Sequence, residues 1–210
     1  MKIWDFKEPS AECSTVLAMI GCKKTDPSYD EFVKTYEEVK DEAFAALNVR
    51  AAAVRTTIPS DFPKSGVLYG KDLIFFMITV GYGISDLAEK YMDEGEYIKG
   101  MIVGGIADEC LFSCEKKAFY DIERYARLND LGIEKILDAP KDFSLSLHKL
   151  IAQRLEAQKN LGMALTEGLM FEPVKSYACA LVLTKDTDKM AIYHSCSECT
   201  LKECTYRNGR

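Results

Sequence analysis

The stretch Leu73-Ile-Phe-Phe-Met-Ile-Thr-Val80 decides the fold of this 210-residue chain. Lys71 and Asp72 precede it and Gly81 follows it, so polar and turn-forming residues bound a continuous apolar run. A strand buried on one face alternates polar and apolar residues, whereas a strand buried on both faces does not. The run therefore predicts a central strand that is covered on both faces of its sheet.

Two helices and a strand are predicted before this run. Ser28 and Glu31 form a capping-box pattern, and the apolar residues after them recur three and four positions apart, as in an amphipathic helix. The β-branched and small residues that follow indicate a strand, which Pro59 and Pro63 end. The predicted elements are a short helix within 11–22, a helix at 29–47 and a strand at 49–58.

Two further helices and a hairpin are predicted after the run. Apolar residues again recur at helical spacing in two segments, and two short β-prone segments then flank a polar turn. The predicted elements are a long helix within 94–128 that Gly132 closes, a helix from 147 to near Gly162, and strands 176–183 and 189–193 joined by the turn 186–188.

The long helix carries an expected buried stripe and several glycines. Gly100, Gly104 and Gly105 each cost about 1 kcal/mol relative to alanine in a helix, which indicates close packing of a neighbouring segment. Cys110 and Cys114 share one helical face and are interpreted as core residues rather than metal ligands. The expected stripe consists of Tyr97, Met101, Leu111, Cys114, Ala118, Ile122 and Tyr125.

Composition excludes several classes of protein. A net charge of -6 and a pI near 5.1 argue against a nucleic-acid partner, which would require a basic face. No stretch approaches the roughly 18 apolar residues of a membrane span, and the charged N-terminus does not resemble a secretory signal. The eight cysteines are therefore interpreted as reduced thiols or ligands, and a cytoplasmic location is expected.

The last fifteen residues concentrate thiols in a polar segment. Cys196, Cys199 and Cys204 follow C-x2-C-x4-C spacing, which can place three thiolates on one metal ion or cluster. Cys179, His194 or an exogenous group could supply a fourth ligand, and four thiolates suit structural zinc or a [4Fe-4S] cluster. Three incidental thiols in a frayed terminus are the alternative.

Three stretches carry a resemblance to a known family. They are Thr79-Val80-Gly81, the small-residue helix segment Tyr97 to Glu109, and Leu165-Thr-Glu-Gly-Leu-Met-Phe-Glu-Pro-Val-Lys-Ser176. Over residues 14–195 the chain resembles the reactivation (activation) domain of cobalamin-dependent methionine synthase and its stand-alone relatives. The resemblance implies an α+β fold with a twisted, mainly antiparallel sheet and packed helices. It also implies a domain at 1–195 followed by a cysteine-rich metal or iron-sulfur tail at 196–210, similar to the ending of some stand-alone relatives.

The resemblance also implies where a cofactor would bind. In the family, the domain presents S-adenosylmethionine to cobalamin, and the matching positions here are Glu109, Pro140 and Glu167. Glu109 and Glu167 could instead have structural roles. Where adenosylmethionine-binding relatives carry Arg-x-x-Pro-Gly-Tyr, this chain has 137–143 with only Pro140 retained from the core of that motif, which counts against adenosylmethionine binding.

Three functions are compatible with these features. The first is a stand-alone protein that docks on a corrinoid protein or a methionine synthase core and assists reductive activation or methyl transfer, with an iron-sulfur cluster in the tail, since zinc has no redox chemistry. The second is a non-catalytic binding module with a structural zinc tail. The third is an adenosylmethionine-binding methyl donor to cobalamin.

Overall fold

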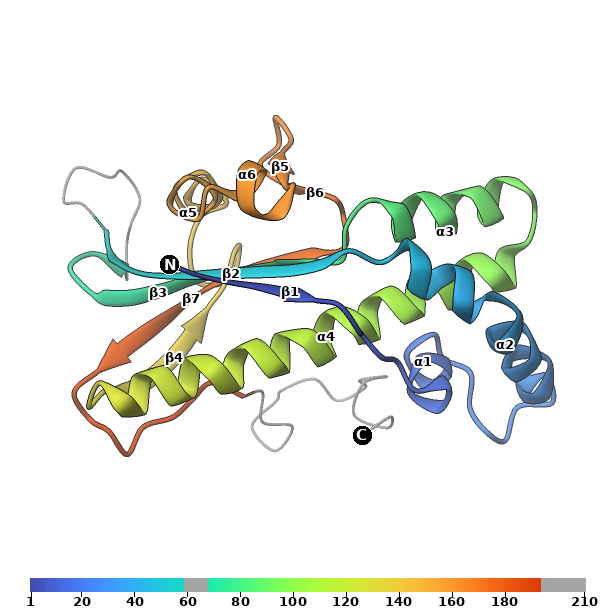
Figure 1. The fold of residues 1–210 in the computed structure, drawn as a ribbon, viewed down its shortest axis with the longest axis horizontal. Helices are drawn as coiled ribbons and strands as arrows, with labels where there is room; N and C mark the ends of the chain where they lie inside the picture. The colour runs from blue at the N-terminus through green and yellow to red at the C-terminus, as the bar shows by residue number, and fades with distance from the viewer. Residues whose placement is uncertain (59–67, 194–210) are drawn as a thin grey trace. The chain divides into compact units, whose positions relative to one another are not determined.

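The structure is a computed structural model that describes residues 1–58 and 68–193. Its elements are β1 (Lys2–Phe6), α1 (Cys13–Met19), α2 (Tyr29–Ala46), β2 (Val49–Thr57), β3 (Asp72–Thr79), α3 (Gly83–Asp93), α4 (Tyr97–Leu128), β4 (Gly132–Leu137), α5 (Leu147–Arg154), α6 (Ala157–Leu161), β5 (Ala164–Leu165), β6 (Phe171–Glu172) and β7 (Ser176–Thr184) (Figure 1). None of these helices has the length and apolar composition needed to cross a membrane.

The chain divides into two compact units that are each built from separate segments. Of the described residues, unit 1 contains 1–5, 50–58, 68–79 and 115–193, and unit 2 contains 6–49 and 80–114. The strands and the helices α5 and α6 belong to unit 1, whereas α1, α2 and α3 belong to unit 2. Helix α4 contributes its first part to unit 2 and its second part to unit 1.

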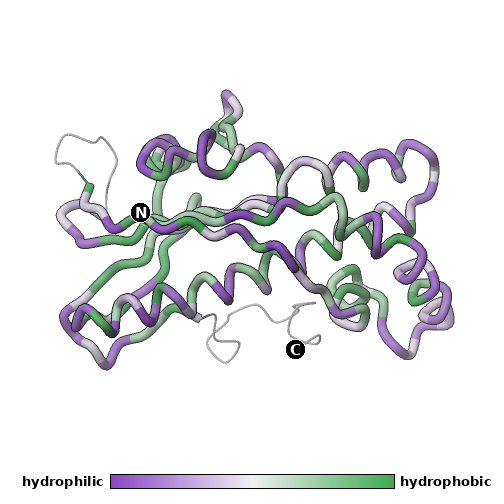
Figure 2. Tube along the Cα trace, viewed as in Figure 1, coloured by the Kyte–Doolittle hydropathy of each residue, from purple (hydrophilic) through white to green (hydrophobic). Residues whose placement is uncertain are grey.

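Unit 1 is organised around β3, as the apolar run predicts. The main sheet has the strand order β1-β2-β3-β7-β4, and β3 pairs antiparallel with both β2 and β7. All residues from Leu73 to Thr79 are buried. Hydrophobic colouring dominates these strands in Figure 2. The expected α+β fold with a mainly antiparallel sheet is therefore confirmed.

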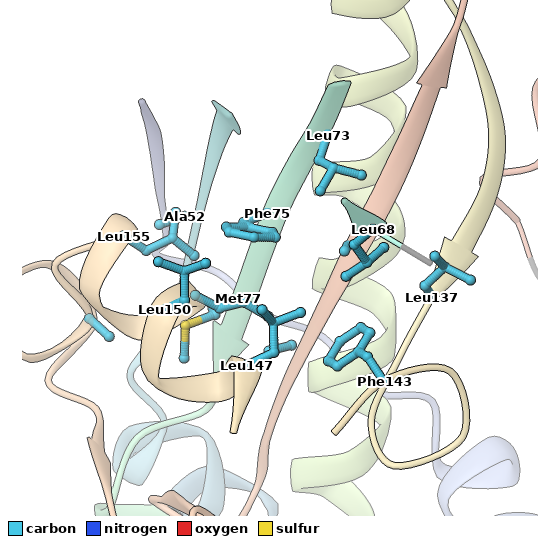
Figure 3. Close-up of a cluster of buried hydrophobic side chains, with 14 of the residues drawn as sticks. Ala52, Leu68, Leu73, Phe75, Met77, Leu137, Phe143, Leu147, Leu150 and Leu155 are labelled. Atoms are coloured by element: carbon cyan, nitrogen blue, oxygen red, sulfur yellow. The ribbon is translucent and has the colours of Figure 1, made fainter. Parts of the chain in front are cut away.

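One face of the sheet packs against α5 and α6. Alternate residues of β3 point to this face, so Leu73, Phe75 and Met77 lie beside Ala178 and Ala180 of β7 in one hydrophobic cluster. Helix α5 adds the side chains labelled Leu147 and Leu150 in Figure 3. Burying such side chains is the main source of stability in a domain of this size.

The other face of the sheet packs against the second part of α4. Phe76 lies on this face and contacts Phe119 of α4 edge to face, with 5.0 Å between the ring centroids. Trp4 of β1 also meets Phe76 at 6.3 Å, and its Nε1 donates a 2.8 Å hydrogen bond to Asp121 of α4. Aromatic pairs in this geometry stabilise by more than their buried area alone. The central strand is thus covered on both faces.

Unit 2 consists of helices. Helix α1 packs on α2, and α2 packs on α3, where the Tyr91 hydroxyl donates a 2.6 Å hydrogen bond to Glu42. Tyr36 of α2 donates a 2.7 Å hydrogen bond to the Ala11 carbonyl, which ties the segment before α1 to α2. Burial raises the pKa of the Tyr36 phenol to about 12, so this donor stays protonated at neutral pH.

Two elements differ from the sequence-based expectation near β7. The predicted strand 189–193 is wrong, because Met190 makes only an isolated bridge to Ile133, and the second neighbour of β7 is β4. Gly132 does not close α4, which ends at Leu128; Gly132 instead begins β4. An added Cβ there would lie 2.0 Å from the Asp186 carbonyl oxygen, so this edge requires glycine because of close backbone approach.

The predicted stripe of α4 is wrong in part. Tyr97, Met101 and Tyr125 are exposed, at 65%, 41% and 40% of their surface. Cys110 and Cys114 are fully buried, which confirms their interpretation as core residues. The buried face of α4 is formed by Ile102, Val103, Ile106, Ala107, Cys110, Leu111, Cys114, Ala118, Phe119, Ile122 and Ala126. The predicted stripe wrongly included two tyrosines and a methionine that lie off the buried face of the helix.

The glycines of α4 allow a matched test of close packing. A Cβ at Gly105 would lie 3.0 Å from methyl groups of Val16 on α1 and of Ile20 directly after it, whereas a Cβ at Gly104 would meet nothing within 4 Å. We expect Gly104→Ala to stabilise the protein by up to about 1 kcal/mol through helix propensity. We expect Gly105→Ala to be less stable than Gly104→Ala by roughly 1–3 kcal/mol, because β-branched side chains adjust poorly. Urea unfolding measures both, and equal stabilities would contradict the packing of α1 on α4.

Candidate functional site

Two of the stretches that carry the family resemblance meet at one end of the sheet in unit 1. Thr79 is the last residue of β3 and Ser176 is the first residue of β7, and the antiparallel register places them opposite each other. The Ser176 hydroxyl donates its single proton to the Pro173 carbonyl oxygen at 2.7 Å, so in its 2.8 Å contact with Thr79 Oγ1 it accepts the Thr79 hydroxyl proton. Thr79 is fully buried, so this contact fixes both strand ends.

Arg50 extends this pair of hydroxyls into a row across three strands. Arg50 begins the part of β2 that lies in unit 1, and it pairs with Thr79 in the β2–β3 register. Sequence reasoning missed Arg50, although an arginine among the small apolar residues of 49–54 is unusual for a strand next to a central strand. We refer to Arg50, Thr79 and Ser176 as the polar row.

The loop that contains Pro140 follows β4 at the same end of the sheet. Leu137 pairs with Ala180, so β4 runs toward the Ser176 end of β7. Asp142 donates its amide to the Asp138 carbonyl oxygen at 2.8 Å and accepts the Asp138 amide at 3.1 Å through its carboxylate. Burial, and then the charge of Asp142, raise the pKa of Asp138. Pro140 itself is exposed and follows a cis peptide bond.

Glu167 lies on the turn of the small hairpin formed by β5 and β6. The hairpin is closed by a 2.9 Å hydrogen bond from the Thr166 amide to the Met170 carbonyl, and Met170 donates its own amide to Thr166 Oγ1 at 3.1 Å. Glu167 is exposed there. Its predicted role in cofactor binding stays a prediction.

His148 of α5 holds this hairpin in place. Its Nδ1 donates to the Leu169 carbonyl oxygen at 2.9 Å, and its ring stacks on Phe171 with 4.3 Å between centroids. His148 is 6% exposed, and burial lowers its pKa below the ordinary value of 6.5. The neutral tautomer with a proton on Nδ1 is therefore the stable form near neutral pH.

Glu109 belongs to a different unit from these residues. It lies on α4 in unit 2 and is half-buried, whereas Pro140, Glu167 and Cys179 belong to unit 1. Its assignment as a cofactor-binding residue stays a prediction.

Cys179, the predicted fourth metal ligand, is fully buried on β7. It pairs with Phe76 and so lies on the sheet face that meets α4. Burial and then the charge of Glu115 raise the pKa of its thiol, while a hydrogen bond with Tyr177 acts in the opposite direction. The protonated thiol is thus the favoured form at this position, and a metal ion that binds Cys179 would have to displace the thiol proton.

The other three predicted ligands, Cys196, Cys199 and Cys204, lie outside the described residues. Within 1–58 and 68–193, no group of three or more histidine, cysteine, aspartate or glutamate side chains is arranged to hold a metal ion. The five cysteines in that part of the chain are free thiols: Cys13, Cys22, Cys110, Cys114 and Cys179. The metal-binding tail therefore stays a prediction.

Comparison with known proteins identifies one informative fold. No protein-family model matches the chain, and no curated protein matches it by sequence. A crystal structure of the MetH reactivation domain bound to AdoHcy matches with a TM-score of 0.53 and 18% sequence identity. The match covers 80% of this chain and 70% of that chain. The two proteins share a fold.

The buried His148 generates a prediction on pH dependence. Because its pKa is lower in the folded protein than in the unfolded chain, its contribution to stability is complete above about pH 6.5 and is lost as pH falls below that value. We expect the free energy of unfolding to decrease less for His148→Gln than for the wild type between about pH 7.5 and 5.5. Urea unfolding at several pH values measures this, and parallel pH profiles would show that His148 does not titrate differently on folding.

Proposed function

We propose that this chain is a counterpart of the methionine synthase reactivation domain, which docks on a corrinoid protein or a methionine synthase core and assists its reductive activation or methyl transfer. The observation that carries the proposal is the contact between Thr79 and Ser176 at 2.8 Å. These residues are 97 positions apart in the sequence and belong to two of the stretches in which the sequence resembles the family. The shared fold with the MetH reactivation domain supports the same proposal.

The cysteine tail would supply electrons in this function. A low-potential electron is needed to return an oxidised corrinoid to its active state, and an iron-sulfur cluster can carry it. Cys196, Cys199 and Cys204 would hold the cluster, with Cys179 as the predicted fourth ligand. Burial raises the pKa of the Cys179 thiol and so opposes loss of its proton to a metal, which keeps His194 or an exogenous ligand as an alternative.

Two other functions use the same fold. A binding module with structural zinc would use the same three tail cysteines, because zinc accepts tetrahedral thiolate ligands. A methyl donor would bind S-adenosylmethionine, and the AdoHcy bound to the MetH reactivation domain favours this reading. The missing arginine, glycine and tyrosine around Pro140 argue against it.

Substitution of one tail cysteine separates the redox function from the zinc module. We expect protein purified without oxygen to contain iron and sulfide and to show a broad visible absorption that bleaches on reduction. We expect Cys199→Ser to lose iron and absorption but to keep the unfolding midpoint of the wild type, since the described members of the hydrophobic cluster of unit 1 lie between Ala52 and Val182. Cys13→Ser is the matched control, because Cys13 lies on α1, away from the tail in sequence.

The outcome for metal content decides between the two functions. A colourless protein with one zinc ion per chain, destabilised by Cys199→Ser, would replace the redox function with the binding module. The corrinoid partner is tested separately, by following the visible spectrum of an oxidised corrinoid protein with a reductant in the presence and absence of the chain. An unchanged rate of corrinoid reduction would contradict the proposed function.

A further inference from the structure

Arg50 is an unusual residue for its position in the sheet. Its Nε is buried and has no hydrogen-bond partner, and no ion pair joins its guanidinium to a carboxylate among the described residues. A buried donor without an acceptor costs about 1–3 kcal/mol, and more when it is charged. Such groups are rare in folded proteins, and a bound ligand, ion or water is among the partners that satisfy them.

Arg55 on the same strand differs from Arg50, because its guanidinium forms hydrogen bonds with a carboxylate of the protein. Its Nε donates to Asp72 Oδ1 at 2.9 Å, and its second nitrogen pairs with the other oxygen of the same carboxylate. Arg55 and Arg50 differ by an odd number of residues, so their side chains lie on opposite faces of the sheet. Among residues 1–58 and 68–193, an ion pair with a carboxylate is thus found for Arg55 and not for Arg50.

The surroundings of Arg50 match what an oxyanion requires. Arg50 lies on the face of Ala52, in register with Thr79, and Ser176 continues the row on β7. Neighbouring strands are about 4.8 Å apart, so the three side chains span roughly 10 Å across the sheet. Arg50 and Ser176 are partly exposed, which leaves the row accessible at its two ends. Because Ser176 donates its proton to Pro173 and the buried Thr79 hydroxyl is bonded to Ser176, Arg50 is the donor of the row that remains for a carboxylate, and a guanidinium can bind both carboxylate oxygens.

We propose that Arg50, at one accessible end of the polar row, binds the carboxylate of a small-molecule ligand. A single guanidinium neutralises a singly charged carboxylate and can bind both of its oxygens. A phosphate dianion would require further cationic groups, and the row contains none in a chain of net charge -6. The site needs neither the cysteine tail nor a corrinoid partner, and it rests on the proposed function only for the choice of one probe.

Ligand binding to the wild type and to three variants of the full chain tests this site. The carboxylate probes are AdoHcy, L-methionine and malonate, and the controls are methylthioadenosine, which lacks the amino-acid carboxylate of AdoHcy, and inorganic phosphate. We expect at least one carboxylate probe to bind the wild type and Arg55→Gln, and to bind Arg50→Gln about tenfold or more weakly. Arg50→Lys should bind with intermediate affinity, because lysine keeps the charge but not the paired donors. Calorimetry measures the affinities.

An NMR measurement on the wild-type protein tests the site without depending on whether the variants fold. In wild-type protein, we expect the bound probe to shift the amide NMR signals of Arg50, Thr79 and Ser176 more than those of Arg55 and Asp72. Absence of binding by all three carboxylate probes would overturn the proposal, as would equal affinities of wild type and Arg50→Gln. Preferential, Arg50-dependent binding of phosphate would overturn the carboxylate assignment. A negative result here leaves iron content and corrinoid reduction unaffected, so the two proposals fail separately.

Discussion

The structure of unit 1 depends on the burial of β3 between two antiparallel neighbours. Backbone groups in a strand that is covered on both faces cannot bond to water, so both edges of β3 must pair with protein. This requirement recruits β2 on one side and β7 on the other, with registers that run over most of the strand. The same registers place Arg50, Thr79 and Ser176 side by side. The location of the candidate site is therefore a consequence of how the core is hydrogen-bonded.

The sequence predicts the elements whose patterns are long and internally consistent. The apolar run 73–80 and the amphipathic helix 29–47 correspond to β3 and α2. Short strands escape the same reasoning, because β1 and β4 contain charged residues such as Lys2 and Glu134 and gain their stability from neighbours far along the chain. The erroneous strand at 189–193 has the same origin: local β propensity indicates an extended segment, but only tertiary context shows that β4 occupies the edge of β7.

The candidate site was predictable only in pieces. Thr79 and Ser176 stand out in the sequence through the family resemblance, but their contact depends on the register between β3 and β7, which no local pattern specifies. Arg50 stands out in the sequence as a charged residue within an apolar strand. Its proposed role in binding becomes visible only in the structure, where its Nε is buried without a hydrogen-bond partner. Glu109, Pro140 and Glu167 occupy exposed or half-buried positions that leave them accessible to a ligand. Their roles depend on the ligand itself.

The contact between Thr79 and Ser176 offers the most direct test of the β3–β7 register and of the location of the site. A double-mutant cycle with Thr79→Val and Ser176→Ala removes each hydroxyl separately and then together, with little change in side-chain volume. The account predicts a coupling free energy of unfolding of about 0.5–1.5 kcal/mol between the two residues. Additive effects, with a coupling indistinguishable from zero, would contradict the register that brings the two family-like stretches together and with it the location of the site.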